Sequence, residues 1–149
     1  MSGATQGKPK TDALAVRCVR GGTIPENRKN APPDRFVVTN GVIFDVQTGR
    51  NWQKSISTAR TFADATSYCA LLTLNGISGF RLPEVHELHT IVDERKADPA
   101  LAETFGSGDH VWSKTKRSGS SDTVWTIDEF DGHTVIYGTA QTAVPRCVR

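Results

Sequence analysis

The sequence predicts an α+β fold in which two helices lie between an N-terminal pair of strands and a C-terminal set of hairpins. β-Branched and aromatic runs around turn dipeptides indicate the strands, and apolar residues at helical spacing indicate the helices. This order of elements is typical of the α+β class. The chain has 149 residues, of which 37% are hydrophobic and 23% charged, as expected for one globular domain with an appendage.

The first strands are expected at the start of the globular part. Residues 36–39 and 42–46 are β-branched or aromatic runs, and they flank the Asn-Gly pair at 40–41, which is typical of tight hairpin turns. The Thr-Gly pair at 48–49 then turns the chain into residues 51–53. We therefore expect a hairpin followed by a further extended segment.

Two helices are expected next. Ser57 can cap a helix that runs to about Leu72, because four apolar residues in it share one face. These four are Phe62, Ala65, Cys69 and Leu72. Pro83 suits the first position of a second helix, since its missing N–H has no partner there in any case. The buried stripe of that helix consists of Val85, Leu88 and Val92.

The last third of the chain favours strands. Residues 111–113, 124–130 and 133–137 are rich in β-formers, and the Asp-Gly pair at 131–132 predicts a hairpin turn between the last two. Residues 144–148 are expected to form a final strand. Pattern alone does not define the order of these strands in a sheet.

The positive charge is concentrated at the N-terminus. Residues 1–35 hold seven basic and three acidic side chains, whereas residues 36–149 are slightly acidic and the whole chain has a net charge of +2. So small an excess argues against a dedicated nucleic-acid-binding protein. No apolar run approaches the roughly 20 residues of a membrane-spanning helix. We interpret 1–22 as a tail, 23–35 as a linker and 36–149 as the folded domain.

Several motifs within residues 36–149 occur in a distinctive order. They are Val42-Ile43-Phe44-Asp45, Trp52-Gln53, Gly79-Phe80-Arg81-Leu82-Pro83 with Glu87-Leu88, Trp112-Ser113, Trp125, and Arg146-Cys147-Val148-Arg149. In this order and spacing they resemble the DUF1566 family, also called the C-terminal domain of the Legionella collagen-like protein (Lcl). The resemblance covers nearly all of the expected domain.

The resemblance implies a C-type-lectin-like fold with two helices and a small twisted antiparallel sheet. It also implies a bacterial protein that is secreted, periplasmic or on the cell surface, because a relative is an adhesin for sulfated glycosaminoglycans. In such folds Cys69 of the first helix would pair with Cys147 of the last strand, and two buried reduced thiols remain the alternative. The family usually has Asp where Glu129 precedes Phe130, so the strand register there stays open.

A short repeat occurs in the tail. Residues 15–20 nearly duplicate residues 144–149, and both segments contain Arg-Cys-Val-Arg. In a tandem protein of this family, Cys18 would be the closing-strand cysteine of a preceding copy. We therefore interpret residues 1–22 as resembling the end of that copy, with a four-residue coincidence as the alternative.

A basic segment between two expected strands is the candidate ligand site. Residues 114–121 place three cations among small hydroxyl residues, and Arg offers a planar fork for sulfate or carboxylate while Lys offers a point charge. The candidate residues for binding an anionic glycan are Lys114, Lys116, Arg117, Ser118 and Ser120. A solvated loop is the alternative. His110 and Arg149 would extend the patch if they lie nearby.

Metal sites are less well supported by the sequence. A first candidate group consists of His86, His89 and Asp93, whose spacing places them on one face of a helix. The group lacks the His-Glu-x-x-His spacing of zinc proteases. A second group has the clustered carboxylates that calcium prefers, and it consists of Asp128, Glu129 and Asp131. Outward-facing and turn-forming roles explain the second group more simply. We therefore expect no metal and no cofactor.

The sequence favours a binding protein over an enzyme. It has no nucleophile-elbow motif, and its cysteines are better explained as a bridge than as a reactive pair. Trp52, Trp112 and Trp125 lie within the family motifs and are expected to be structural. We expect a non-catalytic, exported, adhesin-type module for an anionic or complex polysaccharide. The alternative is a protein-interaction or structural module that contacts a neighbouring tandem domain or surface protein.

Overall fold

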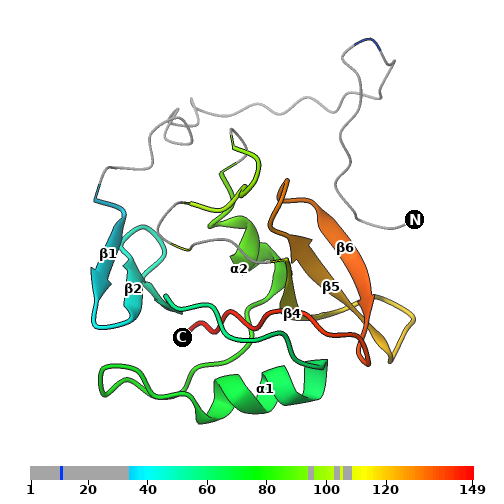
Figure 1. The fold of residues 1–149 in the computed structure, drawn as a ribbon, viewed down its shortest axis with the longest axis horizontal. Coiled ribbons are helices and arrows are strands. Elements are labelled where there is room, and N and C mark those ends of the chain that lie inside the picture. Colours follow the sequence, from blue (N-terminus) through cyan, green and yellow to red (C-terminus); the bar gives the residue numbers. More distant parts are fainter. Residues whose placement is uncertain (1–10, 12–33, 94–95, 103–104, 106–108) are drawn as a thin grey trace.

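A computed structural model describes residues 11, 34–93, 96–102, 105 and 109–149. The interpretations of residues 1–22 as a tail and 23–35 as a linker lie almost entirely outside this part. Within it the chain forms two antiparallel three-stranded sheets and two helices, which confirms the α+β class (Figure 1). Neither of the helices described here has the length and apolar character needed to cross a bilayer.

The first sheet contains β1 (Phe36–Thr39), β2 (Val42–Asp45) and β3 (Arg50–Gln53), in that order. The Asn-Gly turn between β1 and β2 is confirmed, and both of its residues have positive φ angles, of 47° and 84°. A turn of this kind requires φ above zero at both central positions, which Asn and Gly tolerate. Residues 51–53 are confirmed as extended, within β3.

Helix α1 (Phe62–Leu71) begins later than the sequence predicts. Ser57 is not its cap. The N-cap is Thr61, whose hydroxyl accepts a hydrogen bond from the backbone N–H of Asp64 at 3.3 Å. The reason is a tertiary contact, because Arg60 and Ala143 exchange two backbone hydrogen bonds, of 2.9 and 3.0 Å. Arg60 is therefore held in an extended bridge, and the helix cannot begin before it.

Helix α2 (Val85–His89) is a short five-residue helix. Its first helical residue is Val85, not Pro83, so the predicted start is wrong by two residues, and Glu84 is the N-cap. Glu84 and Glu87 form a reciprocal capping box, in which the Glu87 carboxylate accepts the Glu84 backbone N–H at 2.8 Å. Val92 lies beyond the helix end but still packs against the core.

The second sheet contains β4 (His110–Lys116), β5 (Thr123–Asp128) and β6 (Thr134–Gly138) in that order. Strand β4 is longer than expected, and β5 ends before Phe130. The predicted Asp-Gly turn between β5 and β6 is confirmed. Gly132 has a φ of 77°, and a Cβ there would lie 2.6 Å from a Val92 methyl group, so both backbone and packing require glycine.

The C-terminal segment, residues 143–149, connects the two sheets. It makes isolated bridges and is not the continuous final strand that we predicted. Val144 pairs with Val111 of β4. Val148 pairs with Trp52 of β3 and with Arg81. Figure 1 shows this segment in red, running from the side of β4–β6 towards β1–β2 and over α1. The predicted Cys69–Cys147 disulfide is present and ties it to α1.

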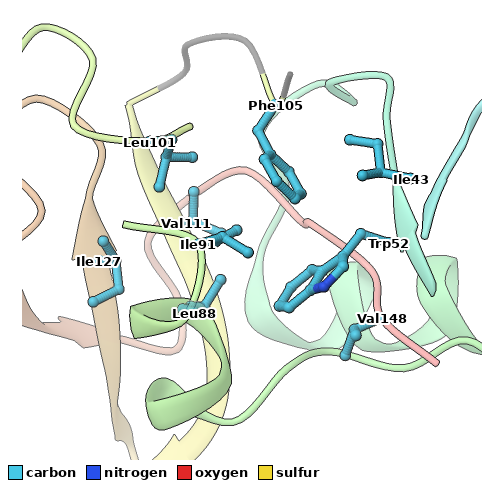
Figure 2. Packing of buried hydrophobic residues seen from close by; sticks show 9 residues of the cluster. All are labelled: Ile43, Trp52, Leu88, Ile91, Leu101, Phe105, Val111, Ile127 and Val148. Carbon is cyan, nitrogen blue, oxygen red and sulfur yellow. The ribbon is translucent and has the colours of Figure 1, made fainter. Parts of the chain in front are cut away.

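Two buried clusters lie on opposite faces of the β4–β6 sheet. Leu88 of α2 packs on one face against Val111 and Ile127, in the cluster of Figure 2. The other cluster joins α1 to the opposite face through Ala65, Trp112 and the disulfide. The remaining residues of the first cluster are Ile43, Trp52, Ile91, Leu101, Phe105 and Val148. Trp52 and Trp112 are thus structural, as predicted, whereas Trp125 is half-buried and lies in neither cluster.

We predict that the disulfide contributes strongly to stability. The two cysteines are 78 residues apart in sequence, and closing a loop of that length contributes about 4–5 kcal/mol in the chain-entropy model. Cys69→Ser with Cys147→Ser should lower the free energy of unfolding in urea by about 3–5 kcal/mol.

Cys18→Ser is the matched control and should leave that free energy unchanged. Equal unfolding midpoints for wild type and the double variant would contradict the bracing role of the bridge.

Candidate functional site

The candidate ligand site is a strand end followed by a turn. Lys114 and Lys116 lie in β4 instead of the predicted loop, and the turn begins at Arg117. The backbone N–H of Arg117 donates to the Thr123 carbonyl at 3.0 Å, and that of Ser120 donates to the Arg117 carbonyl at 3.2 Å. These bonds close the turn tightly between β4 and β5.

Lys114 is held by the N-terminus of α2. Its ammonium group lies 3.2 Å from a Glu84 carboxylate oxygen, and its backbone N–H donates to the Pro83 carbonyl at 2.8 Å. The hydroxyl of Thr115 donates to the same carboxylate at 2.5 Å. The Thr115 hydrogen bond, followed by the contact with Lys114, lowers the pKa of Glu84. Lys114 is therefore neutralised locally and joins β4 to α2.

Lys116 and Arg117 are the two cations that remain available. Both side chains are exposed, and neither has a carboxylate partner among the residues that the structure describes. Lys116 is the last residue of β4 and Arg117 follows it, so the two charges lie at the same end of the sheet on successive residues. Such a pair is suited to an anionic group that approaches from solvent.

The hydroxyl groups of the turn take part in its own hydrogen bonding. Ser118 is exposed, while the Ser120 hydroxyl accepts the backbone N–H of Asp122 at 3.3 Å. Ser121 donates its hydroxyl to the Asp122 carboxylate at 2.8 Å. Asp122 thus adds a negative charge beside the two free cations, which the sequence-based site did not include.

His110 and Arg149 do not extend the candidate site. His110 begins β4 and Lys116 ends it, so the rise of a strand separates them by about 20 Å. Arg149 exchanges backbone hydrogen bonds of 2.9 and 2.8 Å with Asn51 of β3. In Figure 1 this end of the chain lies far from the β4–β5 turn.

A buried carboxylate, Glu87, receives two arginines from different segments. Arg81 binds it through two hydrogen bonds of 2.7 and 2.8 Å, and Arg50 of β3 adds a third of 2.8 Å. These contacts lower the pKa of Glu87 to about 2, and the hydrogen bonds from Arg81 make the largest contribution. The same bonds raise the pKa of Arg81. The distinctive Gly-Phe-Arg-Leu-Pro motif and the following Glu therefore form a structural clamp.

Two further ion pairs fix other motif residues. Arg35 binds Asp45 through bonds of 2.9 and 2.7 Å, and it also donates to the Thr90 carbonyl at 2.9 Å. Burial alone would raise the pKa of Asp45, but the bonds from Arg35 and Thr48 outweigh it and lower the pKa. Arg146 binds Glu129 at 2.8 Å, with both side chains almost fully buried.

The position of Glu129 corrects one prediction. We expected it to face outward with Asp128 and Asp131, yet its side chain is buried and paired with Arg146. The sequence-based calcium group is therefore not assembled. Asp128 and Asp131 do lie together, with His133 as the third member. His86 and His89 are exposed on α2 as expected, and Asp93 lies past the end of that helix.

Sequence reasoning missed these ion pairs because their partners are remote in sequence. Arg50 and Glu87, or Glu129 and Arg146, have no spacing that links them. The one available signal was the presence of charged residues inside otherwise apolar motifs.

The comparisons with known proteins agree with the motifs. Residues 41–149 match the family model of the Lcl C-terminal domain. None of the curated proteins compared with the chain matches it.

We predict that Glu87 makes stability depend on acid pH. Its pKa is lowered from 4.5 to about 2, so its ionised form stabilises the fold above about pH 4.5, and this contribution is lost as the pH falls towards 2. At pH 7, Glu87→Gln should lower the free energy of unfolding by about 2–3 kcal/mol.

Urea unfolding of both proteins between pH 7 and pH 2 tests this, and the difference between them should shrink below about pH 4.5. Asp34→Asn, which removes an exposed carboxylate, should show no such loss at either pH. A difference that stays constant down to pH 2 would contradict the clamp.

Proposed function

The chain belongs to the Lcl C-terminal domain family, and on that premise we propose that it is a non-catalytic, exported, lectin-like module for an anionic or complex polysaccharide. In this proposal the module acts as an adhesin-type binding domain. Sulfated glycosaminoglycans and related polymers are the ligand class.

The arrangement of the elements supports a C-type-lectin-like assignment. Such a fold combines two helices with small antiparallel sheets, and a disulfide between its first helix and its last extended segment closes it. Here Cys147 of the C-terminal segment, residues 143–149 (the closing segment), is bonded to Cys69 of α1. The same bridge favours an oxidising location, whether secreted, periplasmic or on the cell surface, because disulfides persist there. It also leaves neither cysteine as a redox-active thiol, in keeping with a non-catalytic module.

The observation that carries the ligand assignment is the free pair Lys116 and Arg117. By contrast, Arg50, Arg81 and Arg146 are engaged by buried carboxylates. A sulfate or carboxylate of the polymer would accept two parallel bonds from the Arg117 guanidinium, and Lys116 would add a second positive charge for a neighbouring anionic group. Ser118 offers an exposed hydroxyl beside them. Because these groups are exposed, salt should screen the interaction.

The roles of residues 146–148 support a preceding tandem copy. Arg146 pairs with a buried glutamate, Cys147 forms the disulfide, and Val148 enters the core. Residues 17–19 repeat these three residue types in the same order, as a closing segment of another copy would. Two linked copies would bind a repetitive polymer more tightly than one, because the second contact is intramolecular.

We predict that removing the two free cations weakens binding to heparin, used here as a sulfated polymer. Lys116→Ala with Arg117→Ala should raise the dissociation constant by about tenfold at low salt, since two charge-assisted contacts are lost. Binding measured by calorimetry should also weaken for the wild type as salt rises from about 20 to 300 mM.

Lys54→Ala with Arg149→Ala is the matched control. It removes two exposed cations elsewhere, and its binding should stay within about twofold of wild type. If the wild type binds no member of a glycan array at low salt, the function is wrong. If both double variants bind equally well, only the site is wrong.

A protein-interaction or structural module is the alternative, and an exposed apolar strip favours it. Val37 of β1 and Phe44 of β2 are paired in the ladder and are 46% and 40% exposed, and Val46 next to them is 56% exposed. Exposed apolar patches mark contact surfaces when they are contiguous. The partner would be a neighbouring copy of the domain.

Light scattering tests the alternative. A dimer at about 100 μM that Phe44→Ser converts to a monomer, with no response to glycans, would favour it. A wild type that stays monomeric at that concentration would exclude pairing between copies.

A further inference from the structure

Carboxylate and imidazole groups meet at the end of the second sheet where β5 turns into β6. Asp128, Asp131 and His133 each offer a ligand atom, and these atoms lie within 4.8 Å of one another. They form the one such group of three among the residues that the structure describes. The proposed glycan site lies at the opposite end of β4, so the two features are separate.

The turn leaves one oxygen of each carboxylate unused. One Asp128 oxygen accepts the backbone N–H of Phe130 at 2.8 Å, and one Asp131 oxygen accepts that of His133 at 3.1 Å. The same Asp131 oxygen contacts the His133 ring nitrogen Nδ1. Each aspartate is therefore fixed by the backbone while its second oxygen remains available to a cation.

His110 of the neighbouring strand β4 lies beside this group. It stands opposite Asp128 in the β4–β5 ladder, and its Nε2 lies 3.7 Å from the second Asp128 oxygen. The ring stacks on Tyr137, with 4.4 Å between the ring centroids, and its Nδ1 lies 2.7 Å from an Asp109 oxygen. A carboxylate on Nδ1 orients the imidazole and leaves Nε2 free to bind a metal, as in many histidine metal sites.

The charges at this end of the sheet attract a cation. Asp109, Asp128 and Asp131 form ion pairs only with histidines among the described residues, and none with Lys or Arg. When the histidines are neutral, the negative charge of this region is uncompensated.

From this geometry we propose that Asp128, Asp131, His133 and His110 bind one divalent metal ion of the zinc class. Two imidazoles and two carboxylates suit Zn²⁺, whereas Ca²⁺ prefers oxygen ligands throughout. The ion would join the start of β4, the end of β5 and the turn into β6. From the sequence we expected no metal here, and the calcium group considered there included the buried Glu129 and neither histidine.

Calorimetric titration with Zn²⁺ alone tests the proposal. All proteins carry Cys18→Ser, so that this thiol cannot supply a ligand, and the disulfide is kept. We expect one zinc ion per chain at protein concentrations of about 10–100 μM. His133→Ala and Asp128→Asn should each weaken binding at least about tenfold. The amide introduced by Asp128→Asn still offers an oxygen to the Phe130 N–H, so the turn should persist in that variant.

His86→Ala with His89→Ala is the matched control. The chain has four histidines, and this variant removes the two exposed ones on α2, so its zinc binding should equal that of the wild type. Titration with Co²⁺ gives a second readout, because visible absorption bands that disappear with His133→Ala report imidazole ligation directly. Absence of zinc binding, unchanged binding by His133→Ala and Asp128→Asn, or loss of binding in the α2 variant would each overturn the proposal and indicate Asp–His ion pairs without a metal.

Discussion

The closing segment, residues 143–149, is the constraint on which the rest of the structure depends. Two small sheets cannot bury much surface on their own, and this segment gives them a shared edge. It pairs with β3 and with Arg81 at one end, with β4 at the other, and a disulfide holds it to α1. The side chains of Val148 and Cys147 point into the two separate core clusters. A break in this segment would therefore affect both cores and both sheets together.

Buried charge is the second organising feature. Glu87 of α2 binds Arg81, which precedes the helix, and Arg50 of β3, so one carboxylate joins three segments. The pair between Arg146 and Glu129 joins the closing segment to the end of β5. Leaving Glu87, Glu129 or Arg146 without its partner would be costly, because these three side chains are buried and a buried unpaired ion is strongly unfavourable. The ion pairs explain Arg81, Glu87 and Arg146 of the family motifs as structural residues, whereas Lys116 and Arg117 make no such pair among the described residues.

Local chemistry determined which parts of the structure the sequence could predict. The turns at Asn40-Gly41 and Asp131-Gly132 were predictable because their residues alone favour positive φ angles. The pairing of Cys69 with Cys147 came from the family resemblance. The predicted start of α1 was wrong because Arg60 is hydrogen-bonded to the distant Ala143. Glu129 was predicted to face solvent, but its side chain is buried in an ion pair with Arg146. The Asp–His group was found only in part, because Asp128 and Asp131 were grouped with Glu129, which is buried, and without His133.

The central claim of the proposed function is that Arg50, Arg81 and Arg146 hold the fold while Lys116 and Arg117 bind an anionic ligand. The most direct test is an NMR titration of the ¹⁵N-labelled protein with a sulfated heparin oligosaccharide at low salt. The account predicts chemical-shift changes confined to the end of β4 and the turn before β5, with the amides of Arg50, Arg81 and Arg146 unchanged. Changes centred on those three arginines, or no changes at all, would contradict it.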